Sequence, residues 1–172
     1  MKDLSYPIRS NHTKLSVQEL AENYSKNLFT IALNICKNPH DAEDVVQDTF
    51  LTCLTQNKEF ESQEHIRAWL IRVTINKAKN KTKTFWRKNI GSLEEYMASV
   101  EFPSQEASDL FEAVMGLPEK YRIVIHLFYY EDYSVQEISE ILKLSPGNVK
   151  VRLSRGRAAL RNILREEWDD EQ

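Results

Sequence analysis

A chain of 172 residues is long enough for one domain or for two small ones. Its 41% hydrophobic and 28% charged residues are typical of a folded globular protein and argue against a disordered chain. No apolar run approaches the ~18 residues that a membrane span needs. The first residues lack the apolar core of a signal peptide. We therefore expect a cytoplasmic protein that does not insert into membranes.

Helical spacing recurs along the first half of the chain, whereas strand-like alternation is scarce. Ser16 and Glu19 have the spacing of a capping box, which predicts the start of a helix. Asn38 followed by Pro39 predicts a second start, because proline suits the first helical turn. Ser62 is expected to cap a third helix. The apolar stripe of the second predicted helix consists of Val45, Val46, Phe50, Leu51 and Leu54.

The periodic pattern is interrupted over residues 88–104, which carry Gly91 and Pro103. Such a stretch predicts a linker, with room for one short helical turn. Helical spacing then resumes and stops at Gly116, a natural C-cap. The sequence therefore predicts an all-α protein of two small helical domains, 1–87 and 105–172, joined by a linker.

The C-terminal domain contains the pattern of a helix-turn-helix. Ser134 and Glu137 form a second capping box before a short apolar stripe. Lys143 and Leu144 follow as a turn. Ser145 is then a good N-cap, with a proline in the first position of the next helix. A short helix, a tight turn and a longer helix are the helix-turn-helix layout.

Positive charge is concentrated in two segments, although the formal net charge is −3. Residues 66–88 hold eight Lys or Arg and residues 143–165 hold seven, and neither segment contains an acid. One such segment is usually just a solvated face. Two of them on predicted helices, one interleaved with Trp69, Phe85 and Trp86, favour nucleic acid. Cations displace the counterions of phosphates, and rings can stack on unpaired bases.

The spacing of the last predicted helix assigns its faces. Positions expected to pack inward recur at steps of three and four: Val149, Leu153, Gly156, Leu160 and Leu164. Early residues of such a helix reach base edges while nearby cations hold phosphates. The base-edge candidates are Asn148, Val151, Ser154 and Arg155, and the phosphate candidates are Lys150, Arg152 and Arg157. Spacing alone does not separate these two roles. The alternative is a three-helix packing unit with a solvated basic side, but the coincidence of acid-free charge with the cap-turn-cap order favours DNA binding.

The sequence contains no pattern of a catalytic or metal site. It lacks a glycine-rich phosphate loop, a G-x-S-x-G motif and a cysteine pair at ligand spacing. Cys36 and His40 are four residues apart, but Pro39 between them argues against one continuous turn, and two ligands do not close a zinc site. We therefore predict no enzyme activity, no cofactor and no bound metal.

Three segments together resemble a known family. They are NPHDAEDVVQDTFL (38–51), IRAWLIRVTINKAKN (66–80) and LPEKYRIVIHLFYYEDYSVQEISEILKLSPGNVKVRLSRGRAALR (117–161). In this order and with a linker between them, they resemble the extracytoplasmic-function class of bacterial sigma factors, small members of the sigma-70 family. The resemblance implies a transcription initiation factor that binds RNA polymerase core and recognises the −10 and −35 promoter elements. It also implies an anti-sigma partner.

The first of these segments resembles the part of the family that docks on RNA polymerase. Its polar face supplies the expected polymerase-binding residues Asp41, Glu43, Asp44, Gln47 and Asp48. Their plainer explanation is that acids are favoured at a helix N-terminus by the helix dipole.

The second segment resembles the part that melts and reads the −10 element. The residues expected to bind this DNA are Arg72, Asn76, Lys79, Asn80, Lys83 and Trp86. Many family members carry Asp where this chain has Asn80, which leaves the −10 preference open. Trp69 has a strong competing role in the core, because its spacing with Val73 is that of a buried face.

Two other functions are compatible with parts of the pattern. A helix-turn-helix regulator that is not a polymerase subunit would bind duplex DNA through the same C-terminal helix, but it needs a dimer face to read two half-sites. A protein adaptor would leave the cations of residues 66–88 unexplained.

Overall fold

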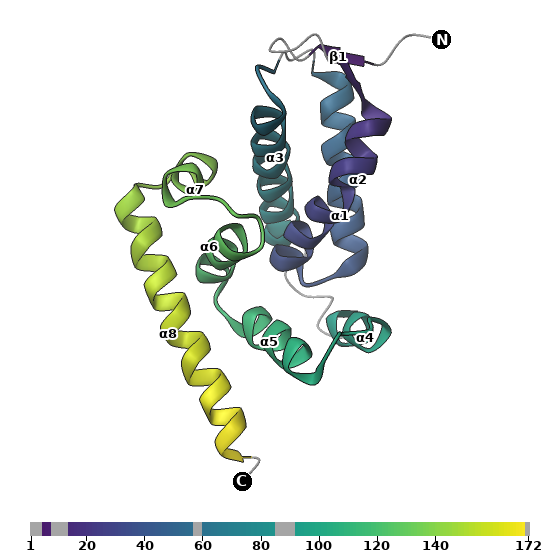
Figure 1. The fold of residues 1–172 in the computed structure, drawn as a ribbon. Helices are drawn as coiled ribbons and strands as arrows, with labels where there is room; N and C mark the ends of the chain where they lie inside the picture. The colour runs from purple at the N-terminus through teal and green to yellow at the C-terminus, as the bar shows by residue number, and fades with distance from the viewer. Residues whose placement is uncertain (1–4, 8–13, 57–59, 85–91, 171–172) are drawn as a thin grey trace. The chain divides into compact units, whose positions relative to one another are not determined.

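The computed structural model describes residues 5–7, 14–56, 60–84 and 92–170. It divides into two compact units, Met1–Ser92 and Leu93–Gln172 (Figure 1). The predicted all-α fold is confirmed, since helices make up nearly all of the described chain. In the described residues the exception is a short antiparallel ribbon of β1 (Ser5–Pro7) and β2 (Lys14–Ser16), which the sequence did not predict.

The first unit is a bundle of three helices that begin at the predicted caps. They are α1 (Val17–Cys36), α2 (Pro39–Thr55) and α3 (Gln63–Thr84). Ser16 and Glu19 exchange both hydrogen bonds of a capping box. Asn38 Oδ1 accepts from the Asp41 amide at 3.0 Å, and Ser62 Oγ accepts from the His65 amide at 3.0 Å. Each cap satisfies a backbone donor that the first turn leaves without a helical partner.

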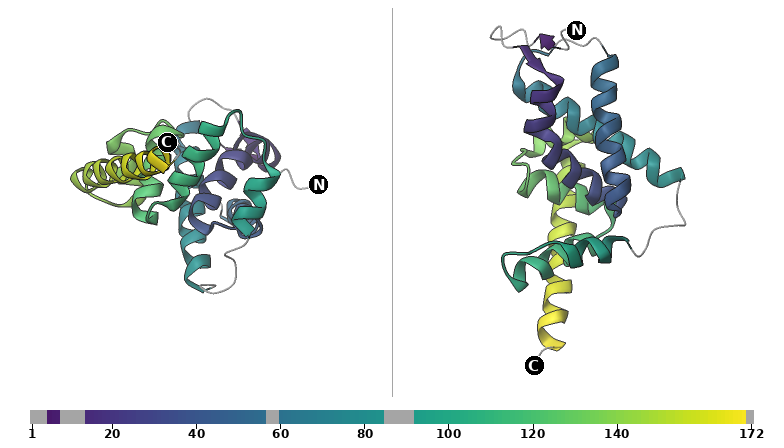
Figure 2. Two further views of the ribbon diagram at one scale, coloured as in Figure 1. Left: turned by 90° about the horizontal axis from the view of Figure 1, so that it is seen from below. Right: turned by 90° about the vertical axis from the view of Figure 1, so that its right-hand side faces the viewer.

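The core of this bundle lies where the three helices pack against one another, and Figure 2 (right) shows α1 and α2 side by side. Its largest fully buried side chains include Leu20, Leu28, Ile31, Ile66 and Leu70. A polar contact lies within it, between the buried hydroxyls of Thr49 and Thr74 at 3.2 Å. Because each hydroxyl has a partner, neither carries the cost of an unsatisfied buried group.

The predicted apolar stripe of α2 is wrong at its C-terminal end. Val45 is buried, but Leu51 is 57% exposed and Leu54 is 37% exposed. The buried face continues instead through Thr49 and Cys53, which follow Val45 at four-residue steps. Thr49 is tolerated there because its hydroxyl bonds within the bundle, so a polar residue took a core position that the sequence pattern gave to leucine.

Helix α4 (Ser92–Ser99) lies within the predicted linker. It is one short helix of eight residues, where the sequence left room for a single turn.

The second unit contains four further helices. They are α5 (Gln105–Gly116), α6 (Glu119–Tyr129), α7 (Val135–Leu142) and α8 (Pro146–Asp170). The buried Arg122 of α6 donates to the carbonyl oxygens of Met115 (3.2 Å) and Leu117 (2.6 Å). These bonds satisfy carbonyls at the end of α5. The helix stops at Gly116 as predicted, but the C-cap residue is Leu117, with φ −65°.

Helices α7 and α8 form the predicted helix-turn-helix. Ser134 and Glu137 complete a capping box at the start of α7. Lys143 ends α7 in the left-handed region with φ 54°, which turns the chain sharply. Ser145 Oγ then accepts from the Asn148 amide at 3.1 Å and caps α8. The fold class, including the helix-turn-helix, is as predicted.

Candidate nucleic-acid interfaces

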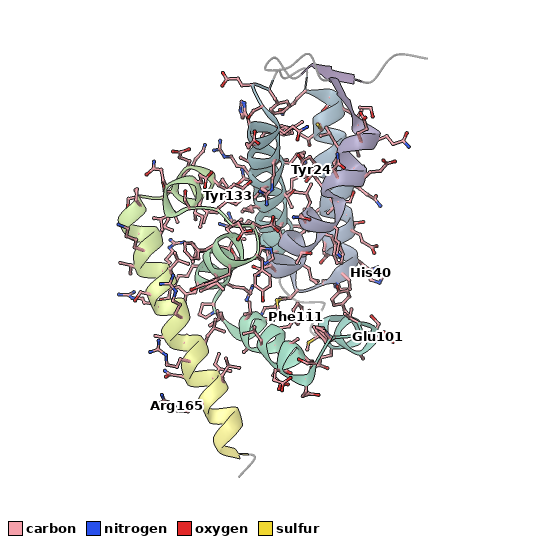
Figure 3. All side chains as sticks on the ribbon, viewed as in Figure 1. Tyr24, His40, Glu101, Phe111, Tyr133 and Arg165 are labelled. Carbon is pink, nitrogen blue, oxygen red and sulfur yellow. The ribbon has the colours of Figure 1, made fainter. Side chains whose placement is uncertain are left out.

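The faces of α8 divide as the spacing predicts. Val149, Leu153 and Gly156 are buried against the rest of the unit, whereas Leu160 and Leu164, further along the helix, are only half-buried. The predicted DNA-binding residues lie on the exposed side: Asn148, Lys150, Val151, Ser154, Arg155 and Arg157 are exposed, and Arg152 is half-buried. Val151 is 49% exposed, which is unusual for a β-branched apolar residue among cations. Further along the helix, Arg165 points outward in Figure 3.

Two of the predicted residues at the start of α8 already contact each other. Arg152 Nε donates to Asn148 Oδ1 at 2.8 Å, one helical turn away. An asparagine that reads adenine uses both its oxygen and its nitrogen. Asn148 must therefore exchange the Arg152 contact for the base if it reads a base edge in this way.

Two further arginines of α8, Arg157 and Arg155, lie beside tyrosines of α6. Arg157 Nε donates to the Tyr129 hydroxyl at 2.6 Å, and its guanidinium carbon lies 5.6 Å from the centre of the Tyr129 ring. A hydrogen bond with Arg155 lowers the pKa of Tyr121. The sequence analysis selected neither tyrosine. Their eight-residue spacing on one helical face was the available signal.

On α3 the predicted DNA-binding residues are spread over an accessible side of the helix. Asn76, Asn80 and Lys83 are exposed, whereas Arg72 and Lys79 are half-buried. Trp86 lies outside the described residues. Trp69 is 8% exposed and meets the Phe60 ring edge-on at 5.3 Å, so its competing role in the core is the one observed.

The acidic surface of α2 contacts α3 through a residue that the sequence analysis did not select. Lys81 Nζ lies 2.9 Å from Asp44 Oδ2 and 3.6 Å from Asp41 Oδ1. The bond to Asp44 raises the pKa of Lys81. The remaining predicted residues of this surface, Glu43, Gln47 and Asp48, are exposed. Lys81 was missed because nothing in the sequence shows which of the α3 cations faces α2.

The described residues contain no group of three or more His, Cys, Asp or Glu side chains that could hold a metal ion. Across the same residues, no helix is both long and apolar enough to cross a membrane.

Two family models match the chain, one in each unit. The model for sigma-70 region 2 matches residues 20–90, and the model for sigma-70 region 4 matches residues 108–160. The first match begins within α1 and includes α2 and α3, and the second begins within α5 and ends within α8, the second helix of the helix-turn-helix. Together they take up more than half of the chain. A helix-turn-helix regulator unrelated to polymerase would not account for the region 2 match, so the alternative function is disfavoured.

Sigma factors of other bacteria are similar to this chain over most of its length. The chain is 28% identical to the ECF RNA polymerase sigma factor SigW of Bacillus subtilis, over 86% of this chain and 88% of SigW. It is 26% identical to SigM of the same organism, over 91% of this chain and all of SigM. It is 29% identical to SigE of Mycolicibacterium smegmatis, over 87% of this chain and 62% of SigE.

Solved structures share the fold. The sigma factor RpoE of Bartonella quintana, crystallised with the anti-sigma factor NepR, superposes with a TM-score of 0.68 at 20% identity, covering 86% of this chain and 96% of RpoE. CnrH, solved in complex with the cytosolic domain of CnrY, gives a TM-score of 0.65 at 25% identity, covering 87% of this chain and 88% of CnrH. On the two family models and these relatives, the chain belongs to the sigma-70 family of non-catalytic transcription initiation factors, in its extracytoplasmic-function class.

Proposed function

We propose that this sigma factor divides its work among three surfaces in two domains. As an initiation factor it directs RNA polymerase core to promoters. In our assignment the 1–87 domain binds polymerase through α2 and captures the −10 element through α3. The 105–172 domain reads the −35 element through α7 and α8, and residues 88–104 connect the two.

The observation that carries the −35 assignment is the composition of the exposed face of α8. The segment 143–165 has seven cations and no acid, and it begins with a capped helix after a tight turn. Exposed Asn148 and Val151 supply an amide that can pair with adenine and a side chain that can contact a thymine methyl group. Lys150, Arg152 and Arg157 supply charge for phosphates, which fixes register without reading sequence.

The −10 assignment is supported by polar groups on α3 that suit separated strands. Asn76 and Asn80 are exposed and can hydrogen-bond the Watson–Crick edge of an extruded base. Lys79 and Lys83 follow on neighbouring turns and can neutralise the backbone. Trp86 is the remaining aromatic candidate for stacking, because Trp69 is buried.

The polymerase assignment is supported by the exposed acidic and polar side of α2. Glu43, Asp44, Gln47 and Asp48 all lie on it, and Asp41 lies at its edge, half-buried beside Lys81. Rim charges of this kind steer association and fix register with a basic partner surface.

We further propose an anti-sigma partner and a cytoplasmic location. The Bartonella quintana RpoE was crystallised with such a partner, and the family resemblance supports one for this chain. A cytoplasmic location follows from the place where bacterial polymerase and promoter DNA meet.

Run-off transcription tests the function most simply. Bacterial core polymerase and this protein alone are given a pool of templates with randomised promoters, and the transcribed templates are sequenced. We expect initiation at templates that share two elements at fixed spacing. Salt-sensitive duplex binding by the full chain without any initiation would instead favour the regulator.

A further inference from the structure

Helices α6 and α8 approach each other closely at Gly156. A Cβ atom at this position would lie 3.0 Å from Ile125 Cγ1 and 3.4 Å from Tyr121 Cβ. Real Cβ contacts are rarely so short, so the glycine permits this crossing. Ile125 therefore lies directly under Gly156, and the neighbouring arginines of α8 are brought to α6.

The residues around this crossing form two tyrosine–arginine pairs. Tyr121 and Tyr129 lie four residues before and after Ile125, so all three share one face of α6. Arg155 and Arg157 flank Gly156 on α8. Arg157 donates to Tyr129, whereas Arg155 lies close enough to Tyr121 to lower the pKa of its phenol, and the Tyr121 ring also lies 5.0 Å from Lys120 Nζ. Three cations thus gather at two phenol groups, and all three are exposed.

The Tyr129–Arg157 pair fixes one guanidinium in a definite orientation. The Nε of Arg157 is used by the tyrosine, and its guanidinium carbon lies 5.5 Å from the Phe128 ring centre and 5.6 Å from that of Tyr129. A guanidinium has five N–H donors, so the Nη groups remain for a planar, bidentate acceptor. The tyrosine hydroxyl accepts from Arg157, and its own proton can be donated to the same acceptor.

We propose that Tyr129 is a positioning residue for promoter binding: it holds Arg157 so that the arginine Nη groups and the tyrosine hydroxyl bind one phosphate of the DNA backbone. This inference rests on the proposed function of α8. It assigns Arg157 to phosphate, because an arginine held against α6 does not extend to a base edge. Pre-orienting a long side chain reduces the conformational entropy that it loses on binding.

A double-mutant cycle tests the pair, using the full chain and a short duplex of random sequence. Phosphate contacts do not depend on sequence, so this probe reports on them directly. We expect Arg157→Ala to lower the slope of log affinity against log salt by about one. Tyr129→Phe keeps the ring, and we expect it to weaken binding about three- to ten-fold. In the Arg157→Ala background the same change should weaken binding by a smaller factor, because only the direct contact of the hydroxyl with the phosphate is then lost.

The matched control is Tyr130→Phe. Tyr130 is exposed to nearly the same degree as Tyr129, 55% against 52%, but it stacks on His126. The Tyr130→Phe substitution should leave the affinity for the duplex and the slope of log affinity against log salt unchanged. The melting temperature of each variant should also match that of the parent.

Two results would overturn the inference: Tyr129→Phe binding as tightly as the parent, or losing the same factor with and without Arg157. Failure of the proposed function has a different signature. In that case the parent protein would bind the duplex but would not support initiation by core polymerase.

Discussion

The two basic helices, α3 and α8, hold their cations by different means. On α3, Lys81 is paired with the carboxylates of Asp44 and Asp41 on α2. On α8, Arg157 is held by the neutral hydroxyl of Tyr129. A carboxylate cancels the charge that it orients, whereas a phenol orients the charge and leaves it whole. Equal numbers of basic residues in a sequence therefore do not mean equal charge available to DNA.

Contacts on the two helices also shift side-chain pKa values in opposite directions. The bond to Asp44 raises the pKa of Lys81, because the carboxylate stabilises the ammonium ion. The bond with Arg155 lowers the pKa of Tyr121, because a cation stabilises the phenolate. Lys81 thus serves the α2–α3 interface, while the arginines of α8 stay available to a ligand.

The largest effect is expected from reversing the charge of Asp44. Asp44→Lys should reduce run-off transcription with core polymerase by at least about ten-fold, because like charges placed across an interface cost several kcal/mol. Salt-dependent duplex binding by the chain alone should remain. The reason is that Asp44 belongs to the proposed polymerase surface and not to α8.

Asp44 also contacts Lys81, so the control is the swapped pair Asp44→Lys with Lys81→Glu. The swap restores an ion pair between α2 and α3 but leaves a cation facing polymerase. If transcription returned in the swapped protein, Asp44 would matter only as the partner of Lys81. An exposed pair of this kind is worth only ~0–1 kcal/mol in stability.

The close approach of α6 and α8 gives the next prediction. Gly156→Leu should lower the free energy of unfolding by about 1–3 kcal/mol, the usual cost of overpacking. The matched control is Gly147→Leu, since a Cβ at Gly147 meets no atom within 4 Å. Urea denaturation followed by circular dichroism measures both. If the two variants had the same free energy of unfolding, the close approach of α6 and α8 at Gly156 would be contradicted.

A smaller effect separates the cations of α3 from one another. Lys79→Ala with Lys83→Ala should lower the salt slope for a single-stranded oligonucleotide by about 1.4, at roughly 0.7 for each phosphate contact. Lys81→Ala should change this slope less, because its charge is already neutralised by Asp44 and Asp41. If each of the three lysines contributed equally to the salt slope, the charge of Lys81 would be as available to DNA as that of Lys79 and Lys83, and pairing with carboxylates would not distinguish α3 from α8.

The smallest effect is expected on the phenol of Tyr121, which lies where α6 and α8 cross. Arg155→Ala should raise the pKa of Tyr121 towards its ordinary value, because the cation that favours the phenolate is removed. Nuclear magnetic resonance of ring-labelled tyrosine against pH measures the change. Arg152→Ala is the control, since Arg152 contacts Asn148. If the pKa of Tyr121 were the same in the Arg155→Ala protein as in the parent, the proposed contact between Tyr121 and Arg155 would be contradicted.

Much of the fold could be predicted because its signals are local. The capping boxes at Ser16 and Ser134 and the cap at Ser145 are set by residues three apart, and all three are observed. The end of α2 was predicted wrongly because hydrophobicity alone does not fix a helix face. Leu51 is exposed, while Thr49 occupies the core by bonding Thr74 of another helix.

The candidate site was predictable in composition but not in its pairings. Exposure of Asn148, Val151 and Arg155 follows from their positions on one helix. The contacts of Arg157 with Tyr129 and of Lys81 with Asp44 join residues 28 and 37 positions apart. Such contacts depend on how helices cross, and in α8 that crossing is set by a single glycine.

Site-specific cross-linking tests most directly whether the two basic helices serve different forms of DNA. A photoreactive amino acid is placed at Val151 or at Asn76, the protein is assembled with core polymerase, and a promoter selected by run-off transcription is added. We predict that Val151 cross-links to the upstream duplex element and that Asn76 cross-links to one strand of the opened −10 region. Cross-linking of both positions to the same element, or of Asn76 to closed duplex only, would contradict the account.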